Sequence, residues 1–272
     1  MATPLRVLAC VKRVPAPGAR ISLSPDGRAI DTRNLGFTTS PHEECAVEEA
    51  IRIVEANGGG ATVLTLGPAS AEEQLRYALS VGVDSAVLVT HASFDGSGDA
   101  GGEGGVDAEW DAQATARALT DAIRGLEATE GVFDLVLFGN ESADTGSFQV
   151  GVRVARALGR PIVNGIKGVD VADGSVTARR ESSAGFEVYG LPLPAVLGVK
   201  EGINLPRYPT MPGRLRSKKA VITRVDASPV PGGLSPTGFA NPVEQVTDTV
   251  VLGNGASAAG AVVDLLIELG LA

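Results

Sequence analysis

The chain carries few sulfur, imidazole or aromatic groups. Among its 272 residues only two are cysteine and two are histidine, and aromatic side chains account for 4%. Cys10 and Cys45 are too few for the disulfide framework of a small secreted domain. So few thiol and imidazole groups also leave little for metal chemistry. We therefore expect no metal centre, and a reducing compartment, the cytoplasm.

Long hydrophobic runs and an excess of basic charge are also missing. No apolar stretch reaches the roughly eighteen residues that a membrane-spanning helix needs, and the first apolar stretch lacks the cationic segment of a signal peptide. The chain has 32 acidic and 23 basic side chains, a net charge of −9. Because general nucleic-acid binding needs a basic face that neutralises phosphates, we expect neither nucleic-acid binding nor direct membrane insertion.

Familiar catalytic signatures are missing too. The chain has no Walker A sequence, no G-x-S-x-G, no H-E-x-x-H and no recognisable catalytic constellation. The run 96–101 formally matches the dinucleotide fingerprint G-x-G-x-x-G. No helix pattern starts at its last glycine, however, and Asp95 and Asp99 would repel a pyrophosphate. Residues 92–107, with six glycines, four acids and no base, predict a flexible surface loop instead.

The chain does have a regular alternation of strand and helix patterns. Apolar residues account for 44% of it, enough for a sizeable core. Strands are predicted over residues 5–11, 61–66, 85–89 and 135–138, with amphipathic helices between them. This alternation predicts an α/β fold, a doubly wound, mostly parallel and Rossmann-like sheet with helices on both faces.

The first helix has a clear start signal. Ser40 and Glu43 form a capping box that predicts a helix with Pro41 at its first position, and the run Asn57–Gly60 stops this helix. Ser70 with Glu73 predicts a second helix start. The polar cluster His42–Cys45 could suggest a metal site. Acids in a first helical turn also suit the positive end of the helix dipole. No second cluster supplies further ligands, so we interpret it as a helix start.

The pattern changes beyond about residue 161. A hairpin is predicted around residues 182–185 and a strand over 195–199, followed by a Pro/Gly-rich extended stretch after Val221 and a short apolar helix at the tail. We expect an α/β domain over 1–223 and a C-terminal arm over 224–272. The apolar tail helix must dock on its own sheet or on another chain.

The loop over residues 139–151 follows a buried strand and opens a helix. In a parallel sheet this is the carboxyl edge, where ligands bind. Its backbone N–H groups and the helix N-terminus could hold a phosphate. Polar side chains in it could bond ribose, base or phosphate: Asn140, Asp144, Thr145, Ser147 and Gln149. A nucleotide site and an ordinary polar turn are equally compatible with this composition.

Residues 202–219 form the second unusual segment. They hold five basic side chains and three prolines in an acidic chain, and Leu205, Tyr208, Met211 and Leu215 give them apolar tips. A stiff, exposed loop with apolar tips and a basic flank suits protein docking. The alternative is a solvated crossover that packs its apolar residues inward. We favour the docking interpretation.

These segments resemble, in order and spacing, the β subunit of electron transfer flavoproteins. Val7–Pro15 is similar to the family's first strand and its V-K-R/Q-V-P turn. Ser40–Ala50 is similar to N-P-F/Y-x-E-x-A-V-E-E-A, and Leu75–Asp84 to L-R-x-A-L-A-M-G-A-D. Asp134–Gly139 resembles D-L-V-L-x-G, and Asn204–Pro209 resembles N-E-P-R-Y-P. The resemblance covers residues 5 to 223.

The resemblance implies an adenine nucleotide alpha hydrolase-like fold and a non-enzymatic electron carrier. The chain would pair with an α subunit that carries most of the redox FAD, accept electrons from dehydrogenases and pass them to a quinone reductase. It would itself bind AMP or a second FAD, with the arm contacting the partner subunit. The implied nucleotide pocket consists of Cys10, Ser40, Pro41, His42, Glu43, Leu66, Gly139, Asn140, Glu141, Ser142, Ala143, Asp144, Thr145, Gly146, Ser147, Phe148, Gln149 and Val150. The implied docking residues are Pro206, Arg207, Tyr208, Met211, Arg214, Arg216, Lys218 and Lys219, with Met211 in the place of the family's anchoring leucine.

The chain departs from the family pattern at several pocket positions. Ser40 replaces an asparagine, His42 an aromatic residue and Glu141 a glutamine. Phe148 could stack on an adenine or fill the pocket. AMP, a second FAD with electron bifurcation, and an empty site therefore remain open. The alternative functions are an adenine-nucleotide-binding α/β protein that acts alone and a purely structural subunit.

Overall fold

The structure is a computed structural model that describes residues 4–91, 94, 110–229, 233–234, 237–243 and 249–271. The chain forms two compact units, Met1–Phe239 and Ala240–Ala272. The predicted loop over 92–107, with the rejected fingerprint inside it, lies outside the described residues except for Phe94.

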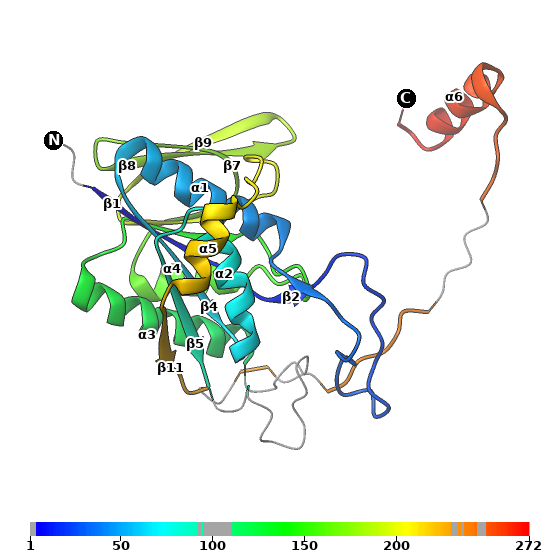
Figure 1. The fold of residues 1–272 in the computed structure, drawn as a ribbon. Helices are drawn as coiled ribbons and strands as arrows, with labels where there is room; N and C mark the ends of the chain where they lie inside the picture. Colours follow the sequence, from blue (N-terminus) through cyan, green and yellow to red (C-terminus); the bar gives the residue numbers. More distant parts are fainter. Residues whose placement is uncertain are drawn as a thin grey trace. The chain divides into compact units, whose positions relative to one another are not determined.

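A nine-stranded sheet forms the centre of the first unit (Figure 1). Its strand order is β11-β5-β4-β1-β6-β10-β7-β8-β9. The strands from β11 to β7 run parallel, and β8 and β9 continue the sheet as an antiparallel extension. Their bounds are β1 Leu5–Cys10, β4 Gly59–Leu66, β5 Ser85–Thr90, β6 Leu135–Gly139, β7 Ile162–Ala172, β8 Ser175–Ser182, β9 Gly185–Pro192, β10 Ala195–Val199 and β11 Ile222–Asp226. The mostly parallel sheet and the predicted hairpin are confirmed.

Helices cover both faces of this sheet, as predicted. Alternate residues of β1 point to opposite sides: Val7 and Ala9 pack in one core with α1 (Pro41–Asn57) and α2 (Glu72–Val81). Leu8 and Cys10 pack in the other core with α3 (Ala112–Glu130) and α4 (Val150–Leu158). Burial on both faces explains why the central strands are continuous apolar runs. Among the described residues, no helix combines the length and hydropathy needed to cross a membrane.

The two predicted capping boxes have different outcomes. At α1 the Glu43 N–H donates to Ser40 Oγ at 3.2 Å and the Ser40 N–H donates to Glu43 Oε2 at 3.3 Å, so this box is confirmed. The second box is wrong. A 3₁₀ turn over Ala69–Ala71 precedes α2, so Ser70 lies inside that turn and its buried hydroxyl has no hydrogen-bond partner.

The segment after residue 202 also differs from its prediction as a loop. Its second half is helix α5 (Met211–Lys219), capped by Thr210 Oγ1, which accepts from the Gly213 N–H at 3.1 Å. Pro212 lies in the first turn of α5, where helical N–H groups have no intrahelical acceptor, so it does not break the helix. The extended stretch expected after Val221 includes β11, which pairs in parallel with β5 and lies across the expected boundary at residues 223/224.

The second unit contains a 3₁₀ turn, Gly255–Ala258, and helix α6, Ala259–Glu268. The predicted tail helix is therefore confirmed. Its apolar side chains are exposed: Val262, Val263, Leu265, Leu266 and Ile267. The role of this unit as an arm that contacts a partner stays a prediction.

Candidate functional site

An open cleft of about 810 Å³ lies at the carboxyl ends of the central strands. The last residues of three of them line it: Cys10 of β1, Leu66 of β4 and Gly139 of β6. The chain passes from β1 to β4 on one side of β1, whereas β6 lies on the other side. Such a reversal of strand order opens a crevice, which is where open α/β sheets bind ligands.

The loop after β6 forms one wall of this cleft. It begins with the Asn140 N–H donating to Val199 O at 2.8 Å, and it folds back on itself through Ser142 N–H to Ser147 O at 2.9 Å. Helix α4 follows, and its N-cap, Gln149, makes no side-chain capping bond. The buried hydroxyl of Ser147 has no hydrogen-bond partner and also lines the cleft. These are the donors that an anionic ligand group requires.

The side chain of Lys12, which follows β1, contacts this loop. The Lys12 ammonium lies 2.8 Å from Asp144 Oδ1 and 3.0 Å from Ser142 Oγ. Burial alone would raise the pKa of Asp144, but the charge of Lys12 and hydrogen bonds from Lys12 and Ser142 lower it overall. Asp144 therefore stays ionised, and its contact with Lys12 ties the loop to the residues that follow β1.

A buried carboxyl forms part of the cleft lining. Glu43, at the N-terminus of α1, is 7% exposed, and desolvation raises its pKa from 4.5 to about 7 despite hydrogen bonds from the Lys12 and Ser40 N–H groups. A Cβ at Gly139 would lie 2.7 Å from Glu43 Cγ and 3.2 Å from His42 Cβ. Only glycine permits this approach of β6 to α1. Burial raises the pKa of the neighbouring Cys10 thiol, so Cys10 stays a protonated wall residue.

His42 joins three parts of the site without lining the cleft. Its Nδ1 accepts from the Glu201 N–H at 2.8 Å, just after β10. Its Nε2 lies 3.8 Å from Glu141 Oε1 in the loop after β6. The two family departures at these positions are therefore neighbours in the fold.

Most residues of the expected pocket lie at the cleft. Those that line it are Cys10, Glu43, Leu66, Gly139, Asn140, Glu141, Ser142, Asp144, Thr145, Ser147, Phe148, Gln149 and Val150. Ser40, Pro41, His42, Ala143 and Gly146 lie outside its lining. Phe148 is 54% exposed and the cleft stays open beside it.

The cleft also has lining residues that the sequence did not predict. Arg13 stacks over the Phe37 ring at 3.5 Å, and Trp110 stacks with Phe94 at 5.3 Å between ring centroids. Further unpredicted lining residues are Lys12, Asp111, Gln113, Thr115 and Asn164. Lys12 and Arg13 directly follow β1, so the strand-end rule that singled out residue 139 could have found them. No comparable signal marks Trp110.

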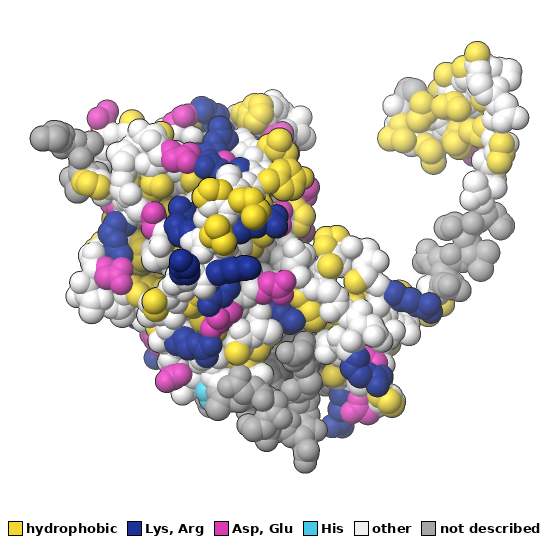
Figure 2. All heavy atoms as spheres, viewed as in Figure 1, with side chains coloured by type: hydrophobic (Ala, Val, Ile, Leu, Met, Phe, Trp, Pro, Cys, Tyr) yellow, Lys and Arg dark blue, Asp and Glu magenta, His cyan; other side chains and the backbone are white. Residues whose placement is uncertain are grey.

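A second notable surface covers α5 and the segment before it. Leu205 and Tyr208 are 90% and 89% exposed, and Met211 and Leu215 are 69% and 58% exposed. Figure 2 shows apolar side chains gathered over α5 beside lysine and arginine side chains. We call these four apolar residues the docking surface. Four of the predicted basic docking residues are exposed: Arg214, Arg216, Lys218 and Lys219. Arg216 also donates to Leu79 O at 2.9 Å, and Arg207 bonds to acidic residues of α1.

No three His, Cys, Asp or Glu side chains converge on a metal site in the described part of the chain. In the His42–Cys45 cluster, Glu43 bonds the helix cap and the Cys45 thiol lies 3.8 Å from Asn204 O.

Comparison with known proteins identifies the family. The family model described as an electron transfer flavoprotein domain matches residues 29–230. Protein FixA of Azorhizobium caulinodans is 34% identical over 221 residues, 80% of this chain and 74% of FixA. The electron transfer flavoprotein subunit beta of Syntrophomonas wolfei is 34% identical over 225 residues, 82% of this chain and 81% of that protein. The subunit beta of Mycobacterium bovis is 32% identical over 240 residues, 86% of this chain and 84% of that protein. The chain therefore belongs to the β subunits of the electron transfer flavoprotein family.

Proposed function

We propose that the chain is the nucleotide-binding half of a heterodimeric electron transfer flavoprotein in the cytoplasm. Its partner is an α subunit that carries FAD, and the complex relays electrons from dehydrogenases to a quinone reductase or another acceptor. The chain serves as a carrier subunit, not as an enzyme. The observation that carries the nucleotide part of this proposal is the open cleft at the strand-order reversal, beside the uncapped N-terminus of α4.

The residues present in the cleft fit an adenine nucleotide. A phosphate suits the first N–H groups of α4 and the unpartnered Ser147 hydroxyl. Phe138 and Leu66 offer apolar surface for a base, and Asn140 and Gln149 offer hydrogen bonds. A bound AMP would supply no redox chemistry. It would stabilise the folded subunit by mass action.

Ser147→Ala tests this assignment of the phosphate side. We expect AMP affinity to fall by about tenfold to a hundredfold, because a hydrogen bond to a charged group contributes roughly 1.5–3 kcal/mol. Calorimetric titration of the purified chain measures the dissociation constant, and emission from Trp110, the only tryptophan, gives a second signal from the cleft wall. Ser175→Ala, on the exposed hairpin turn, is the control. Equal affinity of Ser147→Ala and wild type would contradict the assignment.

The size of the cleft favours a second candidate for the ligand. Small-molecule sites span about 300–1,000 Å³, and this cleft, at about 810 Å³, extends from the loop after β6 to Trp110. A dinucleotide such as FAD would use both ends. In that case the chain would hold its own redox flavin and electron bifurcation would become possible. Separate titrations with FAD and with AMP show which of the two ligands the cleft binds more tightly.

The docking surface supports the proposed relay. Exposed apolar side chains beside basic ones suit a transient partner with an apolar socket and acidic neighbours. We propose that an electron-donating dehydrogenase binds here, with Met211 as the anchor, since a methionine adapts to an irregular socket.

Met211→Ala is expected to raise the KM of a donor dehydrogenase for the complex by about tenfold, because interface anchors contribute about 1–2 kcal/mol or more. The flavin content stays unchanged, because Met211 lies outside the cleft lining. Steady-state electron transfer from a dehydrogenase that reduces the wild-type complex measures this. The control is Val132→Ala, a 53% exposed residue just before β6. Unchanged KM in Met211→Ala would rule out the docking role.

A further inference from the structure

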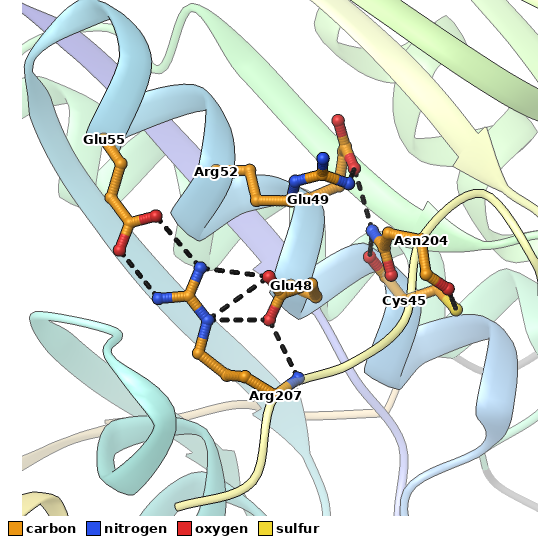
Figure 3. A network of polar contacts seen from close by, with 7 residues as sticks. All are labelled: Cys45, Glu48, Glu49, Arg52, Glu55, Asn204 and Arg207. Carbon is orange, nitrogen blue, oxygen red and sulfur yellow. Dashed lines mark hydrogen bonds and ion pairs between the residues drawn. The ribbon is translucent and has the colours of Figure 1, made fainter.

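Residues 204–208, which include Leu205 and Tyr208 of the docking surface, are attached to helix α1 by hydrogen bonds. Figure 3 shows Asn204 and Arg207 side chains turned toward acidic residues of that helix. Asn204 Nδ2 donates to Cys45 O at 3.0 Å and to Glu49 Oε2 at 2.8 Å. One end of the segment is thus fixed to the middle of α1.

Arg207 makes the stronger attachment. Its Nε and Nη2 donate to the two oxygens of Glu48 at 2.9 and 3.0 Å, and its Nη1 and Nη2 donate to the two oxygens of Glu55 at 2.7 and 2.9 Å. The Arg207 backbone N–H also donates to Glu48 Oε2 at 3.1 Å. Two paired carboxylate contacts on one guanidinium require the planar fork of arginine, which lysine lacks. We call Arg207, Glu48 and Glu55 the clamp.

Burial of Glu48 makes the ion pair with Arg207 necessary. The Glu48 side chain is only 7% exposed, and the Arg207 side chain is 35% exposed. A carboxylate this buried costs free energy unless it is paired, so Glu48 needs Arg207 in place. The hydrogen bonds that Arg207 donates to Glu55 and Glu48 raise the pKa of Arg207, and Arg207 lowers the pKa of Glu55, so Arg207 and Glu55 stay charged near neutral pH.

Polar and apolar side chains of this segment point in opposite directions. Asn204 and Arg207 contact α1, whereas their neighbours Leu205 and Tyr208 are 90% and 89% exposed. Side chains this exposed bury almost no surface and cannot fix their own backbone. The polar contacts on the inner side must therefore hold the apolar pair in position.

We propose that Arg207 is a positioning residue for donor docking: its grip by Glu48 and Glu55 fixes residues 204–208 on α1 so that Leu205 and Tyr208 are presented to the donor protein. This inference rests on the proposed docking role. It assigns Arg207 an inward structural task in place of the direct contact with a partner that the sequence suggested.

The test uses the complex with the α subunit and four variants. Arg207→Met removes the clamp, Arg207→Lys keeps the charge without the fork, and Glu55→Gln weakens one arm without leaving a buried charge unpaired. Arg117→Met is the matched control, since Arg117 makes an exposed ion pair with Asp121 at 3.2 Å on α3. Hydrogen–deuterium exchange of peptides over 203–210 is measured beside electron transfer from a dehydrogenase that reduces the wild-type complex.

We expect Arg207→Met to speed amide exchange over 204–208 by about tenfold or more, since exchange reports local opening. We also expect it to raise the donor KM by about fivefold at unchanged kcat. Glu55→Gln should show smaller changes in the same direction. Arg207→Lys should fall close to Arg207→Met, and flavin reduction by dithionite should match wild type in all variants.

Four results would overturn the proposal. The first is wild-type exchange and wild-type KM in Arg207→Met. The second is wild-type KM in Arg207→Lys with raised KM in Arg207→Met, because then only the charge matters and Arg207 contacts the donor. The third is unchanged KM in both Met211→Ala and Arg207→Met, which removes the docking role itself. Raised KM in Met211→Ala with unchanged KM in Arg207→Met would keep the docking role and reject the clamp.

Discussion

Glu43→Gln is expected to remove a pH-dependent loss of stability of up to about 3 kcal/mol. The pKa of Glu43 rises from 4.5 in the unfolded chain to about 7 in the fold. The folded state therefore binds this proton more tightly, and the unfolding free energy falls as pH rises from about 4.5 to 7. Each tenfold difference in proton affinity corresponds to about 1.4 kcal/mol, which sets the upper limit. Glutamine cannot ionise, and its side-chain oxygen can still accept the Ser40 N–H.

Urea unfolding at pH 5 and pH 8 measures this effect. From pH 5 to pH 8, the unfolding free energy of wild type should fall relative to that of Glu43→Gln. The stability advantage of the variant over wild type is therefore largest at pH 8. Glu73→Gln, an exposed glutamate in the first turn of α2, serves as the control and should follow wild type at both pH values. Parallel profiles for Glu43→Gln and wild type would mean that Glu43 is solvated in the free protein.

Gly213→Ala is expected to displace helix α5 and to weaken donor docking. A Cβ at Gly213 would overlap the backbone carbonyl oxygen of Ser80 in α2, and a backbone atom cannot move aside as a flexible side chain can. Overpacking of this kind costs about 1–3 kcal/mol. Since Met211 and Leu215 lie on α5, we expect the donor KM to rise at least as much as in Met211→Ala.

The matched control for Gly213→Ala is Gly125→Ala. Gly125 lies in the exposed part of α3, where an added Cβ meets nothing within 4 Å. An alanine there should stabilise the chain by up to about 1 kcal/mol through helix propensity and leave the donor KM unchanged. Thermal or urea unfolding and the donor assay provide both readings. A Gly213→Ala variant with wild-type stability and KM would show that α5 is free to move away from α2.

Local signals in the sequence predicted the elements that form the cleft. The capping box at Ser40 located the start of α1, and the apolar runs located β1, β4, β5 and β6. Once a sheet is parallel, its carboxyl ends must meet at one edge, so the loop after β6 could be placed at the cleft from sequence alone. This explains why the loop residues of the expected pocket lie there.

Features that depend on contacts between distant segments could not be predicted in this way. The edge strand β11 pairs with β5, more than a hundred residues earlier in the chain. Pro212 and its neighbours suggested a loop because the cap at Thr210 was not recognised. Arg207 looked like a docking residue because nothing in its local sequence reveals the acids of α1 that hold it. Ser70 matched a cap pattern although the chain enters α2 through a 3₁₀ turn.

We propose that this chain holds an adenine nucleotide within an electron transfer flavoprotein heterodimer. The most direct test is to purify the chain together with the α subunit, denature the complex, and identify and count the released nucleotides. We expect one FAD per heterodimer together with one further adenine nucleotide, AMP for a simple relay or a second FAD if the chain holds its own redox flavin. Release of a single FAD and no other nucleotide would contradict the proposed role of the cleft. A chain that forms no complex and carries no flavin would contradict the proposed function as a whole.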